Sequence, residues 1–424
     1  MCPKHGRSCR RDLLLSFSQK MRTLPWLALE KFTKSFARFL KLNNPPFFKK
    51  MSITEIQSKS ILRKQKKIET WFVSRYGMNL YRGCTHNCAY CDGRTEKYRV
   101  DGEFGKDVAV KVNAIDVLKR ELDPRRKRKP MQKGFIFVGG GVCDSYQPVE
   151  LKYELTRQAL ELMALHNFPV HMLTKSTHIE RDLDVLHQIN EKSRAIISMS
   201  FSSVDDKISR HFEPGVPGPS QRLKTLAKFK KEGFPIGMYL MPVLPFITDT
   251  HDKVQETVSA AANMGIDFII FGGMTLKGGR QHDYLMNVLR DYDRNLAPKY
   301  EQIFTGDQWG RARMDYYDSV HRVFFEIVKE YKIPIRIPPA IWTNFVDSTD
   351  RVIIILEHID YLLKMDNKKS SFGYAAYSIS QLKEPVEHSR QKIEEMKGIG
   401  ATTARLIREI LDTGTSQYYE WLLS

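Results

Sequence analysis

Short apolar runs alternate with longer amphipathic stretches between residues 77 and 272 of the chain. Each run is rich in β-branched or aromatic residues, and apolar residues recur at helical spacing in the stretches between the runs. Strands that alternate with helices in this way indicate parallel β/α units. The expected strands are Gly77–Tyr81, Gly134–Val138, Val170–Thr174, Ala195–Ser200, Ile236–Met241 and Phe268–Phe271.

The stretches between these strands predict the helices that connect them. The pattern favours an α/β fold, a partial (β/α)6 barrel that is an open version of the eight-fold TIM barrel. In such barrels the chemistry takes place at the carboxyl ends of the strands. Residues 275–345 are rich in Tyr, Arg and Pro, and their pattern assigns no element. The expected helices include Ala114–Leu122, Leu151–His166, Asp182–Asn190, Ser220–Glu232 and Lys253–Met264.

From Arg351 onward the pattern becomes helical, which predicts a small all-α domain at the end of the chain. We therefore expect a basic extension at 1–50, a core with flanking segments at 51–350 and a helical domain at 351–424. The helices expected in the last segment are Val352–Lys364, Phe372–Leu382, His388–Met396 and Thr402–Leu411.

The chain of 424 residues carries a formal net charge of +18, which favours a polyanionic partner. Residues 1–50 hold twelve Lys/Arg and two Asp/Glu, a balance of +10, so the remainder carries 18 − 10 = +8. These residues lack the apolar region and cleavage site of a secretory signal. We interpret them as a disordered or non-native extension, with Met51 as the functional start. The alternative is a transit-like or surface-binding segment, because Leu, Phe and basic residues alternate from Leu24 to Leu42.

The apolar runs and the cysteines indicate the compartment. Runs such as Ile353–Leu356 are far too short to span a bilayer, so we expect no membrane span. The six cysteines stand at positions 2, 9, 84, 88, 91 and 143, and three of them form one tight group. This distribution excludes the disulfide framework of a small secreted protein. We therefore expect a cytoplasmic protein.

The tight group has the spacing C-x3-C-x2-C and directly follows the first expected strand. Three thiolates on one loop can ligate three irons of a cubane cluster and leave the fourth iron open. A structural zinc site would normally use four ligands. His86 could be the fourth, but the chain has no second C-x-x-C pair. The spacing favours a [4Fe–4S] cluster on Cys84, Cys88 and Cys91 over a zinc site.

A cysteine triplet after the first strand of a partial β/α barrel resembles the radical S-adenosylmethionine (SAM) superfamily, and Tyr90 before the last cysteine fits its pattern. The resemblance implies a reaction in which the cofactor chelates the open iron. One electron from the cluster then cleaves S-adenosylmethionine, and the 5′-deoxyadenosyl radical abstracts hydrogen from substrate. It also implies a one-electron reductant such as flavodoxin or ferredoxin. The protein would supply positioning and exclusion of water.

The same resemblance suggests residues that bind the cofactor. Gly139, Gly140 and Gly141 follow the second expected strand, where the superfamily uses glycines to let the backbone approach the amino group of the cofactor. Lys175 and Ser200 stand at the ends of the third and fourth strands, matching a lysine and a serine near the cofactor carboxylate. A cation and a hydroxyl aimed at a carboxylate are sound chemistry. Each residue alone is as readily a turn glycine, a surface lysine or a strand-end serine.

Within the superfamily, residues 70–275 resemble spore photoproduct lyase and similar proteins. Two departures concern the site. The lyases carry a tyrosine after the last cluster cysteine, where this chain has Asp92, and Gly141 occupies the place of their hydrogen-donating cysteine. Cys143, two residues further on, is the candidate donor if the strand continues; a small buried apolar role is the alternative. The matching stretches are Asn79–Cys91, Asp144–Glu150, Thr174–Ser176, Phe212–Gly215 with Arg222, and Pro242–Pro245 with Asp249.

Near the end of the chain, Gly398, Ile399 and Gly400 link two expected helices, which is the helix-hairpin-helix signature. Such a turn binds a phosphate through backbone N–H groups without reading sequence. The stretch resembles the small N-terminal domain of family X DNA polymerases. Leu406 stands at the position of their Schiff-base lysine, so the resemblance implies DNA binding without that lyase chemistry. Such motifs also bind RNA or protein.

Three functions remain open from the sequence. The leading hypothesis is a radical SAM enzyme that repairs or modifies DNA, plausibly by splitting a thymine-type photolesion. A radical SAM enzyme that acts on RNA or on a small molecule, with the helical domain as a tether, is the second. The third is a non-catalytic nucleic-acid-binding protein with an iron–sulfur cluster. Reductive cleavage of S-adenosylmethionine separates the third hypothesis from the others.

Overall fold

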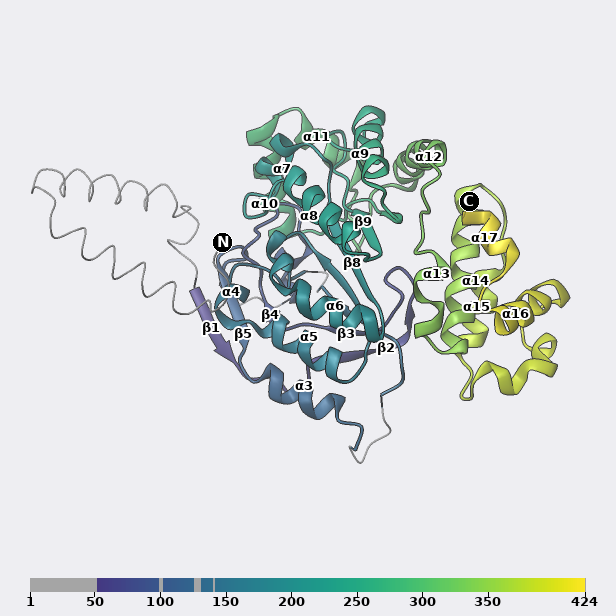
Figure 1. Ribbon diagram of the computed structural model, residues 1–424. Helices are drawn as coiled ribbons and strands as arrows, with labels where there is room; N and C mark the ends of the chain where they lie inside the picture. Colours follow the sequence, from purple (N-terminus) through teal and green to yellow (C-terminus); the bar gives the residue numbers. More distant parts are fainter. Residues whose placement is uncertain (1–51, 99–101, 126–130, 140–141, 424) are drawn as a thin grey trace, which may run out of the picture. The chain divides into compact units, whose positions relative to one another are not determined.

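A seven-stranded sheet forms the centre of the core (Figure 1). The computed structural model describes residues 52–98, 102–125, 131–139 and 142–423. Strands β10-β9-β8-β7-β6-β3 lie in this order and run parallel, and β2 (Leu62–Glu69) pairs antiparallel with β3 at one edge. The parallel strands are β3 (Ser74–Met78), β6 (Phe135–Val138), β7 (Val170–Thr174), β8 (Ala195–Phe201), β9 (Ile236–Leu240) and β10 (Phe268–Phe271).

The predicted partial (β/α)6 barrel is confirmed, because the parallel strands follow one another in the sheet and do not close into a ring. Every residue of β6, β9 and β10 is buried, which explains their uninterrupted apolar runs. The first strand was misplaced: β3 ends at Met78. The backbone turns there because Tyr81 and Arg82 form β4, which pairs with β5 (Asp107–Lys111) in another sheet.

That second sheet has the order β1-β5-β4, with β1 (Ser52–Ile56) parallel to β5. The sequence did not predict β1 or β5. The three cysteines lie on the loop of residues 83–91, the cysteine loop. Because β4 ends at Arg82, this loop begins directly after the small sheet. The small sheet, together with β3, therefore fixes where the loop leaves the barrel.

Helices α3, α5, α6 and α8 cover the outer face of the large sheet (Figure 1). Most begin and end within two residues of the prediction, but the expected helix Leu151–His166 is broken at Glu154, whose φ of 50° is left-handed. Thr250 caps α9 by accepting a hydrogen bond from the Lys253 N–H. The helices of this region are α3 (Ala114–Leu122), α4 (Glu150–Tyr153), α5 (Leu155–Leu165), α6 (Leu183–Lys192), α7 (Asp206–Phe212), α8 (Pro219–Lys231) and α9 (His251–Met264).

Aromatic side chains fill the amino-terminal end of the barrel. The Phe72 ring stacks on Tyr239 with centroids 5.3 Å apart and lies 4.2 Å from the Phe137 ring. His171, beside them, is held by the Phe72 carbonyl and the Ser198 hydroxyl, each at 2.8 Å.

The segment without a sequence assignment is largely helical. Its helices follow β10, and α12 packs against α9 and against α14. The segment contains α10 (Arg280–Tyr292), α11 (Leu296–Ile303), α12 (Met314–Glu330) and α13 (Pro339–Trp342).

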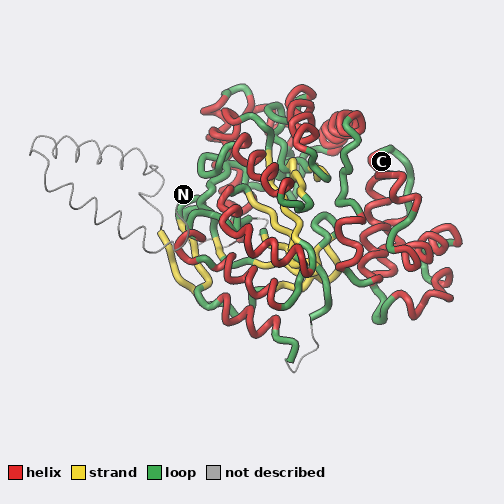
Figure 2. Tube along the Cα trace, in the orientation of Figure 1, coloured by secondary structure: helices red, strands yellow, loops and turns green. Residues whose placement is uncertain are grey.

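The end of the chain is all-helical, as predicted (Figure 2). The expected helix His388–Met396 is a 3₁₀ segment, and the sequence did not predict the last helix. Within the described ranges, no helix is long and apolar enough to cross a membrane. The elements are α14 (Ser348–Met365), α15 (Phe372–Ser380), η6 (Val386–Glu395), α16 (Ala401–Thr413) and α17 (Gln417–Leu423).

Helix α14 joins the C-terminal helices to the barrel. It contacts β2 and α12 as well as α15, α16 and α17, and Ile353–Leu356 are all buried. Asp350 of α14 forms a buried ion pair with Arg75 of β3. His358 contacts the Thr70 carbonyl at 3.0 Å and the Tyr419 hydroxyl at 2.6 Å. The barrel and the C-terminal helices thus share one hydrophobic core.

Candidate active site

The cysteine loop lies beyond β4, and its thiols are sheltered from water. Cys84 and Cys88 are each 6% exposed, and Cys91 is partly buried. Burial raises the pKa of Cys84 well above its usual value, helped by the neighbouring Cys143 and Asp144, and raises the pKa of Cys88 to about 12. The thiols therefore keep their protons at neutral pH unless a bound metal displaces them.

The donor set fits an iron–sulfur cluster better than zinc. Among the described residues, no three His, Cys, Asp or Glu side chains gather closely enough to hold a single ion. In a cubane each thiolate binds a different iron, so the thiols need not converge on one point. His86, the possible fourth zinc ligand, instead points Nδ1 at Asp144 Oδ2, 3.4 Å away. The three cysteines would hold the cluster.

Asp144 ties the cysteine loop to the end of β7. One carboxylate oxygen accepts a hydrogen bond from the Thr174 hydroxyl at 2.7 Å, and the other accepts one from the Lys175 N–H at 2.8 Å. The His86 ring contacts the second oxygen. These contacts join three segments that are distant in the sequence.

Gln147 holds the start of the same loop. Its Nε2 donates to the Gly83 carbonyl at 3.1 Å, and its Oε1 accepts a hydrogen bond from the Thr85 N–H at 3.0 Å. Cys84 lies between these two backbone groups, so the amide fixes the backbone on both sides of the first cysteine.

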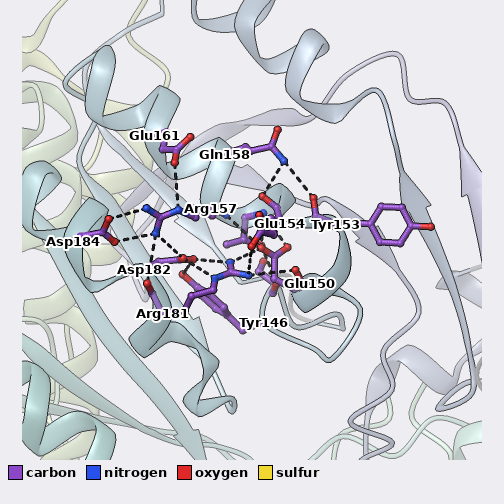
Figure 3. A network of polar contacts seen from close by, with 12 residues as sticks. Tyr146, Glu150, Tyr153, Glu154, Arg157, Gln158, Glu161, Arg181, Asp182 and Asp184 are labelled. Carbon is purple, nitrogen blue, oxygen red and sulfur yellow. Dashed lines mark hydrogen bonds and ion pairs between the residues drawn. The ribbon is translucent and has the colours of Figure 1, made fainter. Parts of the chain in front are cut away.

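Glu150 ends the same stretch inside a buried polar network (Figure 3). Its carboxylate accepts hydrogen bonds from the Tyr81 hydroxyl, from the Thr156 N–H at 2.9 Å and from Arg181 at 2.7 Å. Arg181 also pairs with Asp182. Because Tyr81 belongs to β4, this network anchors the strand from which the cysteine loop departs.

Cys143 points at the cysteine loop. Its thiol donates to the Gly83 carbonyl at 3.1 Å and accepts a hydrogen bond from Gln147 Nε2 at 3.2 Å. The residue is 6% exposed, and burial raises the pKa of the thiol, so it stays protonated at neutral pH. The thiol thus lies beside Cys84 without belonging to the triplet.

Lys175, directly after β7, and Ser200 of β8 lie together at the strand ends. Lys175 Nζ donates to Ser200 Oγ at 3.0 Å and to Glu213 Oε1 at 2.9 Å. Glu213 also receives Arg222 Nη2 at 2.6 Å and the Tyr90 hydroxyl. The network therefore reaches the cysteine loop through Tyr90.

This network has an excess of positive charge. Despite burial, Arg222 and Lys175 hold the pKa of Glu213 far below its usual range, so it is ionised. Two cations then share one carboxylate. The Arg222 side chain is fully buried, whereas that of Lys175 is 13% exposed. Lys175 is thus the less buried of the two cations, and Arg222 alone would still neutralise Glu213.

Gly139 is required by close packing. A Cβ at this position would lie 2.4 Å from the Leu173 carbonyl of β7, so no other residue fits without a shift of the backbone. Gly140 and Gly141, the other two glycines predicted to approach the cofactor, lie outside the described residues.

Asp92, at the position where the lyases carry a tyrosine, is fully engaged. Its carboxylate accepts hydrogen bonds from Thr275 at 2.8 Å, Lys277 at 2.7 Å and Gln281 at 3.0 Å. The side chain therefore fastens the cysteine loop to the segment after β10. The sequence could not assign these partners, because they lie far from Asp92 along the chain and only folding brings them together.

The sequence also gave no role to Gln147, Glu213, Arg222 or Arg94. The first three lie in the stretches that match the lyases, which is the signal that could have identified them. Arg94 lies three residues after the last cysteine of the triplet, and only its contacts reveal its place.

The hairpin between η6 and α16 rests on α15. Gly398 has a φ of 82°, and a Cβ there would lie 2.1 Å from the Tyr374 ring. Ser378 Oγ donates to the Lys397 carbonyl at 2.7 Å. Ile399 is buried, Gly400 is the N-cap of α16, and Leu406 packs in the helical core.

The surface beside the hairpin carries exposed rings and unpaired cations. Tyr374 and Tyr377 are 44% and 56% exposed, with ring centroids 6.2 Å apart. In the part of the chain that the structure describes, Lys397 and Arg405 form no ion pair, whereas Arg408 pairs with Glu394. This surface combines positive charge with aromatic faces.

Two family models match the chain. Residues 78–260 match the radical SAM superfamily, and residues 349–416 match a helix-hairpin-helix domain. The first match spans the cysteine loop, Lys175, Ser200 and Glu213. The second spans α14 to the end of α16.

Several relatives and solved structures are similar to this chain. An uncharacterized protein of Mycobacterium tuberculosis is 27% identical, over 61% of this chain and 75% of the relative. An uncharacterized protein of Methanocaldococcus jannaschii is 25% identical, over 54% and 80%. Spore photoproduct lyase complexed with dinucleoside spore photoproduct aligns with a TM-score of 0.50 at 15% identity, over 66% of this chain and 79% of the lyase. The last likeness establishes a shared fold.

Proposed function

Because residues 78–260 form a radical SAM domain and residues 349–416 a helix-hairpin-helix domain, we propose that this chain is a radical SAM enzyme acting on a DNA base, with lyase-like repair of a photolesion as the specific reaction. The observation that carries the proposal is the cysteine loop itself. Three sheltered thiols lie beside a charge network with one unbalanced cation at the strand ends. The fold shared with spore photoproduct lyase supports the choice of a lesion as substrate.

Each part of the site has a defined task in this proposal. Cys84, Cys88 and Cys91 would hold a [4Fe–4S] cluster, which when bound supplies the electron that cleaves S-adenosylmethionine to a 5′-deoxyadenosyl radical. Lys175 and Ser200 bind the cofactor carboxylate, and Arg222 keeps Glu213 paired meanwhile. The burial of the thiols excludes water from the reacting groups.

Cys143 completes the set as the donor of a hydrogen atom. Its thiol is protonated, buried and held by Gln147, so it is available to a carbon radical and protected from solvent. A departure from the lyases remains at Asp92, whose carboxylate is occupied by Lys277. The return of the hydrogen atom to the cofactor would therefore follow a different path from that of the lyases.

The C-terminal helices supply the contact with nucleic acid. Backbone N–H groups of the hairpin bind a phosphate, and Lys397 and Arg405 add charge that no described carboxylate neutralises. The exposed Tyr377 ring offers a face on which an unpaired base can stack. A lesion would be presented to the barrel in an unstacked or flipped state.

The test is anaerobic reconstitution followed by an activity assay on DNA. The protein should bind about four irons per chain, as a cubane requires, and should form 5′-deoxyadenosine after reduction. Changing Cys84, Cys88 or Cys91 to Ala should abolish both properties. If one of these variants still forms 5′-deoxyadenosine, the proposed site is wrong.

The substrate is tested with matched oligonucleotides. Ultraviolet-irradiated DNA should raise 5′-deoxyadenosine formation above the level with the same DNA before irradiation, and lesions should disappear. Irradiated RNA of the same sequence is the control. Turnover that is equal with all three would contradict the DNA lesion as substrate, while leaving a radical SAM reaction on another molecule. A protein that binds iron but never cleaves the cofactor would be a non-catalytic binding protein.

A further inference from the structure

Arg94 is a buried cation whose guanidinium donates hydrogen bonds to the cysteine loop. It ends the short helix η2 (Asp92–Arg94) and is 6% exposed. Its Nε donates to the Cys88 carbonyl at 3.1 Å, and its Nη2 donates to the Asn87 carbonyl at 3.2 Å and to Asn87 Oδ1 at 2.6 Å. The guanidinium thus holds the backbone directly before and at the second cysteine.

Aromatic rings pack against the rest of the guanidinium. Its Cζ lies 3.4 Å from the centroid of the Tyr284 ring and 5.0 Å from that of Phe104. Within the described ranges, no Asp or Glu forms an ion pair with Arg94, whereas Arg222 in the neighbouring network pairs with Glu213. A buried cation without a countercharge is costly, so such a residue usually has an anionic partner.

We propose that Arg94 is the countercharge of the anionic cluster that Cys84, Cys88 and Cys91 hold, and that its positive charge raises the reduction potential of this cluster. The inference rests on the proposed function. Three thiolates make the bound group negative, and each added electron makes it more so. A fixed positive charge in a poorly hydrated site stabilises the reduced form more than the oxidised form.

The contacts of Arg94 also make it a positioning residue. Asn87 has a left-handed φ of 54°, and the guanidinium holds both its carbonyl and its side chain. Removing the side chain would therefore affect the shape of the loop as well as its charge. Two substitutions separate these effects: Arg94→Lys keeps the charge without the forked hydrogen bonds, and Arg94→Gln removes the charge.

The experiment is a potentiometric titration of the reconstituted full-length protein, monitored by the electron paramagnetic resonance signal of the reduced cluster, with iron content measured alongside. Arg94→Gln should lower the reduced-to-oxidised ratio at a fixed potential at least tenfold, a shift of about 59 mV to more negative potential. Arg94→Lys should stay near the wild-type potential. The control is Arg82→Gln, an exposed cation two residues before Cys84, whose charge water screens and whose loss should change nothing.

Unchanged potentials in an Arg94→Gln protein that keeps about four irons would overturn the proposal. If the Arg94→Gln protein binds no iron, the Arg94→Lys protein decides the question. A cluster reduction potential equal to that of the wild type in Arg94→Lys supports the role of the charge. A lowered reduction potential in Arg94→Lys overturns the proposal. The proposed function fails separately, because in that case the wild-type protein itself binds no cluster or does not cleave the cofactor.

Discussion

Asp144 shows how one side chain sets the shape of the site. It joins the cysteine loop through His86 and the end of β7 through Thr174 and Lys175. Burial opposes its ionisation, but His86, the Lys175 N–H and the Thr174 hydroxyl together lower the pKa of Asp144 to about 2. The charged carboxylate is therefore stabilised by folding.

This lowered pKa predicts a dependence of stability on pH. Asp144→Asn in the cluster-free protein should lower the free energy of unfolding by about 2 kcal/mol at pH 7. Because the folded pKa lies below the ordinary value of about 3.9, the stabilisation is complete above that value and is lost as the pH falls toward 2. Denaturant unfolding at pH 7, 5 and 3 should show the two proteins converging.

Asp184 is the matched control for Asp144. Its pKa is also lowered to about 2, chiefly by the hydrogen bond from Arg157, but its side chain is 59% exposed. Water screens such a pair, so Asp184→Asn should cost well under about 1 kcal/mol. Equal losses of unfolding free energy in Asp144→Asn and Asp184→Asn would contradict the idea that burial makes the Asp144 contacts more stabilising.

Cys143 predicts a change in products without a change in the cofactor reaction. Cys143→Ala should keep the cluster and 5′-deoxyadenosine formation but increase trapped adducts and side products, because the substrate radical lacks a thiol hydrogen. Mass spectrometry of the DNA measures the ratio of repaired product to side products and trapped adducts. Cys143→Ser is the control: a hydroxyl can replace the contacts to Gly83 and Gln147 but is a poor hydrogen-atom donor. An unaltered product distribution in both variants would return Cys143 to a packing role.

At the scale of elements, the hairpin and α15 act as one surface. Gly398 cannot take a larger side chain, because its φ is positive and Tyr374 occupies the space of a Cβ. A Gly398→Val protein would therefore displace Tyr374 along with any bound phosphate. Charge and ring substitutions beside the hairpin are the cleaner test of nucleic-acid binding.

Lys397→Gln and Tyr377→Ala should weaken binding in different ways. Without the lysine, affinity should fall for every DNA sequence, and the slope of log K against log salt should flatten by about 0.7–0.9. Without the tyrosine ring, binding of single-stranded DNA should weaken by roughly 5- to 150-fold, the equivalent of a lost base stack of about 1–3 kcal/mol. Fluorescence anisotropy at several salt concentrations measures both effects.

All proteins in this comparison, including the wild type and the controls, lack residues 1–50, because the net charge of +10 on that segment would add non-specific DNA binding. Tyr377→Phe keeps a stacking ring and should bind as the wild type does. Tyr418→Ala removes an exposed ring from α17 and should have no effect. Equal affinities and slopes for all variants would mean that the hairpin is a packing element.

At the scale of the whole molecule, α14 belongs to the core of the barrel as much as to the C-terminal helices. It carries the ion pair to Arg75 and buries Ile353–Leu356. A chain ending at Asp350 would lose nearly all of this helix and expose the shared core. Deletion of the C-terminal helices would therefore test stability before it tests binding.

The shared core predicts a single unfolding transition. Ile355→Ala should destabilise the chain by about 2–5 kcal/mol, because it leaves a cavity in a fully buried position. Denaturation curves from circular dichroism and from the absorbance of the reconstituted cluster should coincide. The exposed Tyr377→Ala protein is the control and should unfold like the wild type. Separate curves for helix content and cluster would contradict one cooperative unit.

The strands show what the pattern of the chain could predict. β10 begins and ends at the predicted residues, because a strand buried on both faces has an uninterrupted apolar sequence. β7 also begins and ends as predicted, although His171 and Thr174 interrupt its apolar run. β2, with the sequence LRKQKKIE, has no such run because it is an edge strand with an exposed side. The helices after β10 were missed although α10 and α12 are amphipathic, with their buried residues at helical spacing along one face.

Local spacing by itself determined the parts of this protein that lie close together along the chain. The cysteine triplet, the alternation of strands and helices, and the glycines of the hairpin all depend on neighbours within a few residues. Only the tertiary structure decided that Glu213 shares Lys175 and Arg222, that Arg94 stacks on Tyr284, and that α14 lies in the core of the barrel. These contacts join residues far apart in the sequence, and burial away from water, which gives their charges their strength, exists only after the chain has folded.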